Sequence, residues 1–146
     1  MTTVRIWFTK TGEASYISLL DLQRVMQRSI KRSGIPVWYT MGFNPHIYMT
    51  FANPLPLGQE SLVESVDVKT ELEQVPLEDW RQALDRVMPL GIKVTRVTLP
   101  QYKAEKISFA RYQLRMPLSA QASVDAYNQL ETAVIQKKDQ ARPQGD

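Results

Sequence analysis

Apolar and polar residues alternate along several segments of the chain, and this two-residue period is typical of strands with one buried face. The clearest examples are residues 4–9, 62–70 and 92–97. Residues 37–40 and 48–51 have the composition of shorter strands, the second of them inside a loop. We therefore expect a sheet that is built from these segments.

Two further segments place apolar residues three and four positions apart, which is the spacing of an amphipathic helix. The first predicted helix begins after Ser18, a suitable N-cap, and carries Asp21 in its first turn, where an acid favours the helix dipole. It is expected to end at Gly34. The second helix is expected to begin at or next to Pro76 and to end before Gly91.

In chain order these elements form a β-α-β-β-α-β pattern, which predicts an α+β fold. Two helices on one face of a four-stranded antiparallel sheet form the ferredoxin-like arrangement. A partial second β-α unit follows, with a predicted strand from Ile107 to Met116 and a predicted helix from Ser123 to Gln136. We thus predict a ferredoxin-like domain at 1–98, an appended strand and helix packing on it at 99–136, and a flexible tail at 137–146.

The composition narrows the possible chemistry. The chain has 146 residues, of which 43% are hydrophobic and 23% are charged, as in ordinary globular proteins. It has no cysteine, which excludes disulfides, thiolate catalysis, iron–sulfur ligation and cysteine-based zinc sites within this chain. We see no run of apolar residues long enough for a signal peptide or a membrane span, so we expect a cytoplasmic protein with no membrane partner. We also expect no cofactor in this chain.

Positive charge is concentrated near the N-terminus, where residues 1–50 hold six Lys or Arg and two Asp or Glu. On the first predicted helix, the cations lie opposite the apolar arc. These cations are Arg24, Arg28, Lys31 and Arg32. Such a face suits a phosphate backbone or an acidic protein patch, although a merely solvated helix face has the same composition.

Four aromatic residues follow this helix, and they have two possible roles. They are Trp38, Tyr39, Phe43 and Tyr48. Aromatic side chains beside cations can stack on nucleic-acid bases, but they can equally fill the hydrophobic core. For Trp38 and Phe43 we expect the core.

Residues 41–58, MGFNPHIYMTFANPLPLG, are dense in chain-bending residues and contain the only histidine. The Asn44-Pro45 pair predicts a turn that holds His46 in a fixed position. We predict a rigid rim beside the sheet, with Asn44, His46 and Tyr48 as ligand contacts and Asp21 approaching from the preceding helix. A lone histidine beside a turn is more often structural than catalytic, because acid–base chemistry needs a positioned partner.

Four stretches of the sequence carry a family resemblance. They are the Y-I-S-x-L-D-L run from Tyr16, the helix ending in R-x-G-I-P, the G-F-N-P-H run from Gly42, and the F-A-x-P-L-P-L-G-x-E-S run from Phe51. The chain resembles the radical-SAM-linked family of unknown function, whose bacterial members are fused behind radical SAM enzymes or stand alone. The resemblance spans roughly residues 3–98. It implies a bacterial cytosolic domain whose radical SAM chemistry lies on another polypeptide.

The chain also departs from that family's pattern. Family members usually carry a histidine where this chain has Leu19, so a paired-histidine site is absent here. The C-terminal segment is short for the family. The chain therefore resembles a divergent or C-terminally short member.

Three functions are consistent with these observations. The first is a non-catalytic binding module that presents RNA, or an RNA-bearing substrate, to a partner enzyme through the basic helix and the GFNPH loop. The second is an adaptor that docks onto a radical SAM enzyme, which exposed side chains at Ile47, Tyr48, Leu55 and Leu57 would support. The third is a hydrolase or transferase that uses His46 with Asp21, which requires the two side chains within about 3–4 Å of each other, directly or through a water. The sequence leaves enzyme activity open and favours a non-enzyme.

Overall fold

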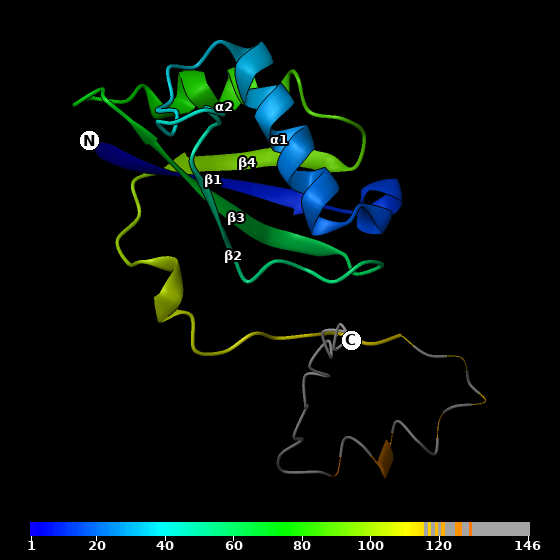
Figure 1. The fold of residues 1–146 in the computed structure, drawn as a ribbon. Helices are drawn as coiled ribbons and strands as arrows, with labels where there is room; N and C mark the ends of the chain where they lie inside the picture. Colours follow the sequence, from blue (N-terminus) through cyan, green and yellow to red (C-terminus); the bar gives the residue numbers. More distant parts are fainter. Residues whose placement is uncertain (116, 118, 120, 122–124, 127–128, 130–146) are drawn as a thin grey trace, which may run out of the picture. The chain divides into compact units, whose positions relative to one another are not determined.

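The computed structural model describes residues 1–115, 117, 119, 121, 125–126 and 129. The chain divides into two units, residues 1–109 and 110–146, each described by itself. The first unit contains a four-stranded antiparallel sheet and two α-helices (Figure 1). The predicted α+β class is confirmed.

The sheet has the strand order β2-β3-β1-β4, and every neighbouring pair is antiparallel. The strands are β1 (Thr2–Lys10), β2 (Met49–Ala52), β3 (Ser61–Thr70) and β4 (Ile92–Thr98). The two long strands lie at the centre, where Ile6 of β1 is opposite Val66 of β3. Successive side chains of a strand point to opposite faces of the sheet. The alternating apolar residues of β1 and β3 therefore all lie on the face that is buried against the helices.

Helices α1 (Leu19–Ser33) and α2 (Leu77–Asp85) cover one face of the sheet (Figure 1). Their apolar side chains join the inward-facing strand residues in a single core cluster, to which α1 contributes Met26 and α2 contributes Leu84. The predicted ends of α1 are confirmed. The Ser18 hydroxyl accepts a hydrogen bond from the Asp21 backbone N–H, and Gly34 ends the helix in the left-handed conformation with φ 77°.

The second strand of the sheet is residues 49–52, and residues 37–40 do not form the predicted strand. They make one bridge pair, between Tyr39 and Ile47, and one backbone bond from the Trp38 N–H to the Lys69 carbonyl. The bend at residues 42–44 folds this segment back on itself, so that Tyr39 pairs with Ile47 before the chain can extend along β3. The chain therefore reaches the edge of the sheet only after the bend.

The predicted strand from Ile107 to Met116 is also absent over residues 107–115, which are irregular and exposed. Alternating sequence alone does not make a strand, because a strand also needs a hydrogen-bonding partner. Met116, most of the predicted helix from Ser123 to Gln136, and the predicted tail at 137–146 lie outside the described residues. The division into one domain, an appended strand and helix, and a flexible tail stays a prediction.

The segment that follows β4 crosses the open face of the sheet, the face that the helices leave uncovered. The Tyr102 carbonyl accepts a hydrogen bond from Arg5 Nη2 on β1 at 2.9 Å. The short 3-10 helix η2 (Ala104–Lys106) then lies against β2. Because β4 and β2 are opposite edges, residues 99–106 form a strap over this face. Among the residues described, no helix is both long and apolar enough to cross a membrane.

An acidic group, Glu64, is buried at the end of the core. It faces inward on β3, directly opposite Phe8, and only 7% of it is exposed. Burial raises its pKa, while the Ser61 side chain and the charge of Lys10 act in the opposite direction. Lys10 is itself buried, donates from Nζ to the Ile17 carbonyl at 2.8 Å, and has a pKa lowered by burial.

The raised pKa of Glu64 predicts a pH-dependent stability difference. The folded chain holds this proton more tightly than the unfolded chain, so the stabilisation is present at low pH and is lost as pH rises through the folded pKa. Glu64→Gln should therefore be more stable than wild type at pH 8, and the difference should shrink towards pH 4. Urea unfolding midpoints of Glu64→Gln and wild type at several pH values measure this stability difference. A difference that stays constant with pH would refute the assignment.

Candidate functional site

The chain between α1 and β2 forms a narrow hairpin loop, residues 38–48. The Thr40 N–H donates to the His46 carbonyl at 2.8 Å, and the Tyr48 N–H donates to the Trp38 carbonyl at 3.4 Å. Between these bonds Tyr39 pairs with Ile47, whose side chain is 1% exposed and anchors the loop in the core. The hairpin loop is thus fixed at its base and projects its tip, residues 41–45.

His46 is held in one orientation by the loop itself. Its Nδ1 lies 3.1 Å from the Asn44 carbonyl oxygen and 3.1 Å from the Thr40 hydroxyl, and its backbone N–H donates to that hydroxyl at 3.2 Å. In the tautomer that carries the ring hydrogen on Nδ1, this nitrogen donates to the Asn44 carbonyl, which can only accept. The other ring nitrogen, Nε2, is a hydrogen-bond acceptor in that tautomer.

A hollow of about 250 Å³ lies between the hairpin loop and α1. It is lined by Gln23, Gln27, His46, Ile47, Tyr48 and Met49. Small-molecule sites usually measure about 300–1,000 Å³, so this hollow suits a fragment such as one base or one side chain. The two glutamines were not predicted. Their spacing of four residues indicates that both lie on the same side of α1. The sequence does not show which loop packs against that side of the helix.

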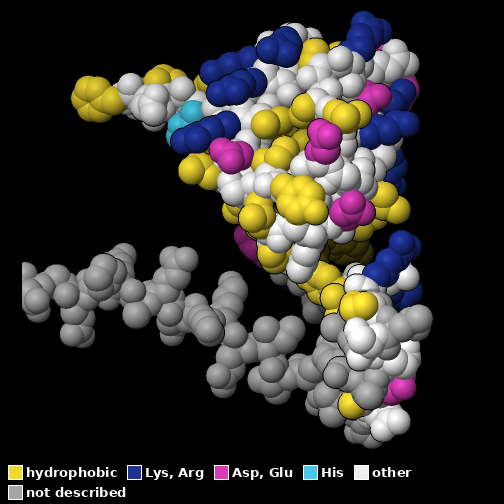
Figure 2. Space-filling view, turned by 90° about the vertical axis from the view of Figure 1, so that its right-hand side faces the viewer, with side chains coloured by type: hydrophobic (Ala, Val, Ile, Leu, Met, Phe, Trp, Pro, Cys, Tyr) yellow, Lys and Arg dark blue, Asp and Glu magenta, His cyan; other side chains and the backbone are white. Residues whose placement is uncertain are grey.

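The exposed face of α1 is basic, as predicted. Arg24, Arg28, Lys31 and Arg32 are all exposed. Among the described residues, Arg24 is the only one of these four with a carboxylate partner, Asp21 at 3.5 Å, and both of those side chains are more than half exposed. Lys31 Nζ lies 6.0 Å from the centre of the Tyr39 ring, which connects the helix to the hairpin loop. Figure 2 shows dark blue Lys and Arg side chains gathered near the cyan histidine.

The tip of the hairpin loop is apolar and exposed, which corrects the expectation that Phe43 fills the core. Phe43 is fully exposed and Met41 is 89% exposed. The turn of the hairpin carries the Phe43 side chain away from the sheet, and the residue type alone does not indicate this position.

The aromatic residues at the base of the loop lie closer to the protein. Trp38 is half-buried, with its ring centre 6.1 Å from that of Tyr48. Lys69 Nζ lies 4.6 Å from the Tyr48 ring centre.

Comparison with protein families matches residues 3–144 to a family described as uncharacterized protein conserved in bacteria (DUF2344). The chain belongs to this family. The match extends well beyond residues 3–98 and covers nearly the whole chain. It confirms a bacterial family of unknown function, and the link to radical SAM enzymes stays a prediction. Comparisons with curated proteins and with solved structures gave no match.

In this DUF2344 member the predicted ligand contacts divide into two groups. His46 and Tyr48 line the hollow together. Asn44 contributes its backbone carbonyl to His46, whereas the Asp21 carboxylate lies near Arg24 and makes no hydrogen bond or ion pair with His46. No group of three or more His, Cys, Asp or Glu among the described residues is placed to hold a metal ion. Among the described residues, His46 therefore has no carboxylate partner within hydrogen-bond or ion-pair distance.

Proposed function

We propose that this protein is a cytoplasmic, non-catalytic module that binds single-stranded RNA, or an RNA-bearing substrate, and presents it to a partner enzyme. One observation carries the proposal: the exposed cations of α1 lie directly beside the hairpin loop, whose aromatic tip is exposed. Phosphates require cations and unpaired bases require aromatic faces, and this surface supplies both. We expect no cofactor on this chain.

The positions of the cations support a bound strand. Arg24, Arg28 and Lys31 lie on successive turns of α1, about 6 and 4.5 Å apart along its axis. They form a row in which phosphates would lie, while Phe43 and Tyr48 offer faces for bases. The Nε2 acceptor of His46 and the amides of Gln23 and Gln27 would contact one base edge in the hollow.

We also propose that the sheet and helices form a ferredoxin-like fold. The strand order β2-β3-β1-β4, the β-α-β-β-α-β sequence of strands and α-helices, and the packing of both helices on one face support this. Folds of this class often bind RNA on their sheets, but the present proposal depends on the residues of α1 and the hairpin loop.

The test is the affinity of a labelled, unstructured RNA oligonucleotide, measured by fluorescence anisotropy over a range of salt concentrations. Arg24→Glu/Arg28→Glu should weaken binding at least about tenfold and lower the salt slope by about 1.4, because each phosphate contact to a single strand contributes about 0.7. The matched control is Arg86→Glu/Lys93→Glu, two exposed cations outside the basic face.

Both double variants change the net charge from +3 to −1, since each reversal removes two units of charge. The control should therefore keep most of the wild-type affinity if the location of the charge matters. Equal losses in the two variants would mean that only overall charge attracts RNA. Absence of salt-dependent binding to the wild type would refute the proposal.

The second candidate is an adaptor that docks onto a radical SAM enzyme. Of the four side chains expected to support docking, Tyr48 and Leu57 are exposed, whereas Ile47 is buried and Leu55 is half-buried. Further exposed apolar side chains lie near the 3-10 helix η1 (Gly12–Tyr16), where the Ser15 carbonyl accepts a hydrogen bond from the Gly58 N–H at 2.7 Å. These side chains are Tyr16, Leu19, Leu20, Leu62 and Val63.

An affinity-tagged chain expressed in its own bacterium should retain an iron–sulfur enzyme if the adaptor proposal is right. Leu57→Asp/Leu62→Asp should then release that enzyme, because the substitutions place charges in the contact. Retention of no iron–sulfur enzyme would count against the adaptor.

A further inference from the structure

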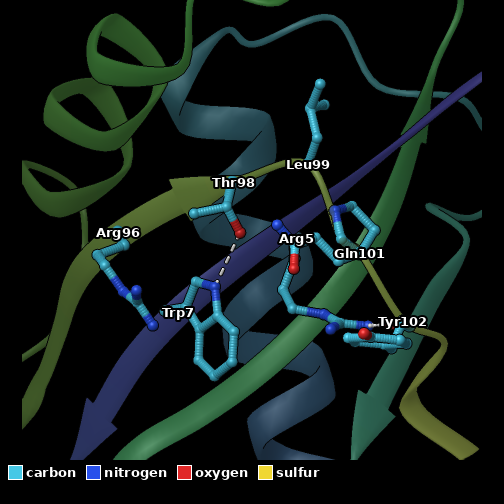
Figure 3. Close-up of a pocket in the computed structure, with 8 residues that line it drawn as sticks. Arg5, Trp7, Arg96, Thr98, Leu99, Gln101 and Tyr102 are labelled. Atoms are coloured by element: carbon cyan, nitrogen blue, oxygen red, sulfur yellow. Dashed lines mark hydrogen bonds between the residues drawn. The ribbon is translucent and has the colours of Figure 1, made fainter. Parts of the chain in front are cut away.

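The open face of the sheet contains a second hollow, remote from the helices. It measures about 390 Å³ and is lined by β1, β4 and the strap that follows β4. Its lining residues are Arg5, Trp7, Arg96, Thr98, Leu99, Pro100, Gln101 and Tyr102 (Figure 3). This volume lies within the usual range for small-molecule sites, unlike that of the hollow beside His46.

Trp7 and Arg96 form a stack inside this hollow. They are direct neighbours across β1 and β4, and the guanidinium carbon of Arg96 lies 4.7 Å from the centre of the indole ring. The Trp7 indole N–H donates to the Thr98 hydroxyl at 2.9 Å, which fixes the plane of the ring. Figure 3 shows the Arg96 side chain extending from β4 towards Trp7 while Leu99 points away.

Arg5 fixes the other side of the hollow. Its Nε and Nη2 donate to the two carboxylate oxygens of Asp67 at 2.7 and 2.9 Å, and Nη2 also donates to the Tyr102 carbonyl. These bonds leave Nη1 without a partner among the described residues. No buried side-chain polar atom in the described part of the chain lacks a partner, so this nitrogen reaches the surface.

The charge of the hollow is positive. Asp67 neutralises Arg5, whereas Arg96 has no carboxylate within ion-pair distance among the described residues. A planar cation stacked on an indole offers one more flat surface on its outer side, where a base can stack, and its N–H groups suit a phosphate. Gln101 and Thr98 add polar groups at the rim.

We propose that this hollow binds one nucleotide of an RNA strand, with the base stacked against the Trp7–Arg96 pair and the phosphate on Arg96 and Arg5 Nη1. The inference rests on the proposed RNA-binding function and gives it a second contact. Lys69 lies two residues from Asp67 on the same face of β3, and its ammonium stacks on Tyr48 of the first site. The Lys69–Tyr48 pair would therefore contact an RNA strand that runs from the hairpin loop to the open face of the sheet.

The experiment follows the indole N–H signals of the labelled full-length protein by NMR. The chain has three tryptophans, so Trp7→Phe identifies the Trp7 signal by its loss. Titration with adenosine 5′-monophosphate should shift the Trp7 signal to saturation and leave the signal of the buried Trp80 in place. Ribose 5-phosphate, which lacks the base, should bind at least about tenfold more weakly, since stacking of one base contributes that much or more.

Three variants and a longer ligand complete the test. Arg96→Ala should weaken binding of the nucleotide about tenfold or more, whereas Lys93→Ala, an exposed cation on the same strand and outside the hollow, should keep it within about twofold. Arg24→Glu/Arg28→Glu should also leave nucleotide binding at Trp7 unchanged. An adenosine hexanucleotide should bind more tightly than the mononucleotide, because it also reaches the first site.

The results that overturn the inference are distinct from those that overturn the proposed function. A Trp7 signal that does not move, equal affinity for ribose 5-phosphate, or an Arg96→Ala variant that binds like wild type would refute the hollow as a nucleotide site. Equal affinity for the mononucleotide and the hexanucleotide would show that the hollow binds a free nucleotide and not a nucleotide of an RNA strand. Nucleotide binding at Trp7 without salt-dependent RNA binding would refute the proposed function and leave the hollow standing.

Discussion

Replacing Gly91 by alanine is expected to lower the free energy of unfolding by about 3 kcal/mol or more. Gly91 has φ +89°, a conformation that residues with a side chain rarely adopt. An added Cβ would also lie 2.4 Å from the Thr11 carbonyl oxygen and 2.8 Å from the Ala14 Cβ. The Ala14 N–H holds that oxygen in place, so the contact cannot be relieved cheaply.

Gly34 provides the matched control for this prediction. It also has a positive φ, of 77°, but an added Cβ would meet nothing within 4 Å. Gly34→Ala should therefore cost only about 1 kcal/mol, the conformational part of the penalty. Urea unfolding of both variants measures the difference. Equal losses would show that the contact between Gly91 and the segment leading to α1 does not constrain the fold.

Replacing Asp67 by alanine is expected to cost about 2–3 kcal/mol of stability. Asp67 lies directly opposite Arg5 across β1 and β3, and the two side chains are only 14% and 11% exposed. The hydrogen bonding that Arg5 donates to the Asp67 carboxylate is the main reason that the pKa of Arg5 is raised, while burial acts against it. Without the carboxylate, a largely buried guanidinium loses two hydrogen bonds.

A double variant separates the loss of the pair from the loss of packing. Arg5→Leu/Asp67→Leu removes both charges and should recover part of the stability lost in Asp67→Ala, because no uncompensated charge is left. Glu78→Ala breaks an ion pair with Arg81 on the surface of α2, and its unfolding midpoint should stay close to wild type. An Asp67→Ala variant as stable as Glu78→Ala would contradict the account.

The parts of the fold that follow from local chemistry could be predicted from the sequence. Ser18 and Gly34 begin and end α1 as expected, because capping depends only on neighbouring backbone groups. The position of the second strand depends on which segment reaches the edge of β3, and that is a non-local choice. The same limit applies to the absent strand at 107–115, where alternation was present but a partner strand was not.

The candidate sites show a similar division. The cations of α1 follow from helical spacing, and His46 and Tyr48 from the unusual composition of their loop. The Trp7–Arg96 stack joins residues that are far apart in the sequence, on two strands whose register the sequence does not reveal. Phe43 was misassigned because hydrophobicity alone does not distinguish a core residue from one at the tip of a turn.

Photo-cross-linking of a 4-thiouridine-containing RNA, followed by mass spectrometry of the linked peptides, tests the central claim most directly. Links are expected to Phe43 or Tyr48 of the hairpin loop, and they should be lost in Arg24→Glu/Arg28→Glu but not in Arg86→Glu/Lys93→Glu. Saturable RNA binding with no link to residues 38–48, or links that persist after the α1 charges are reversed, would contradict that claim.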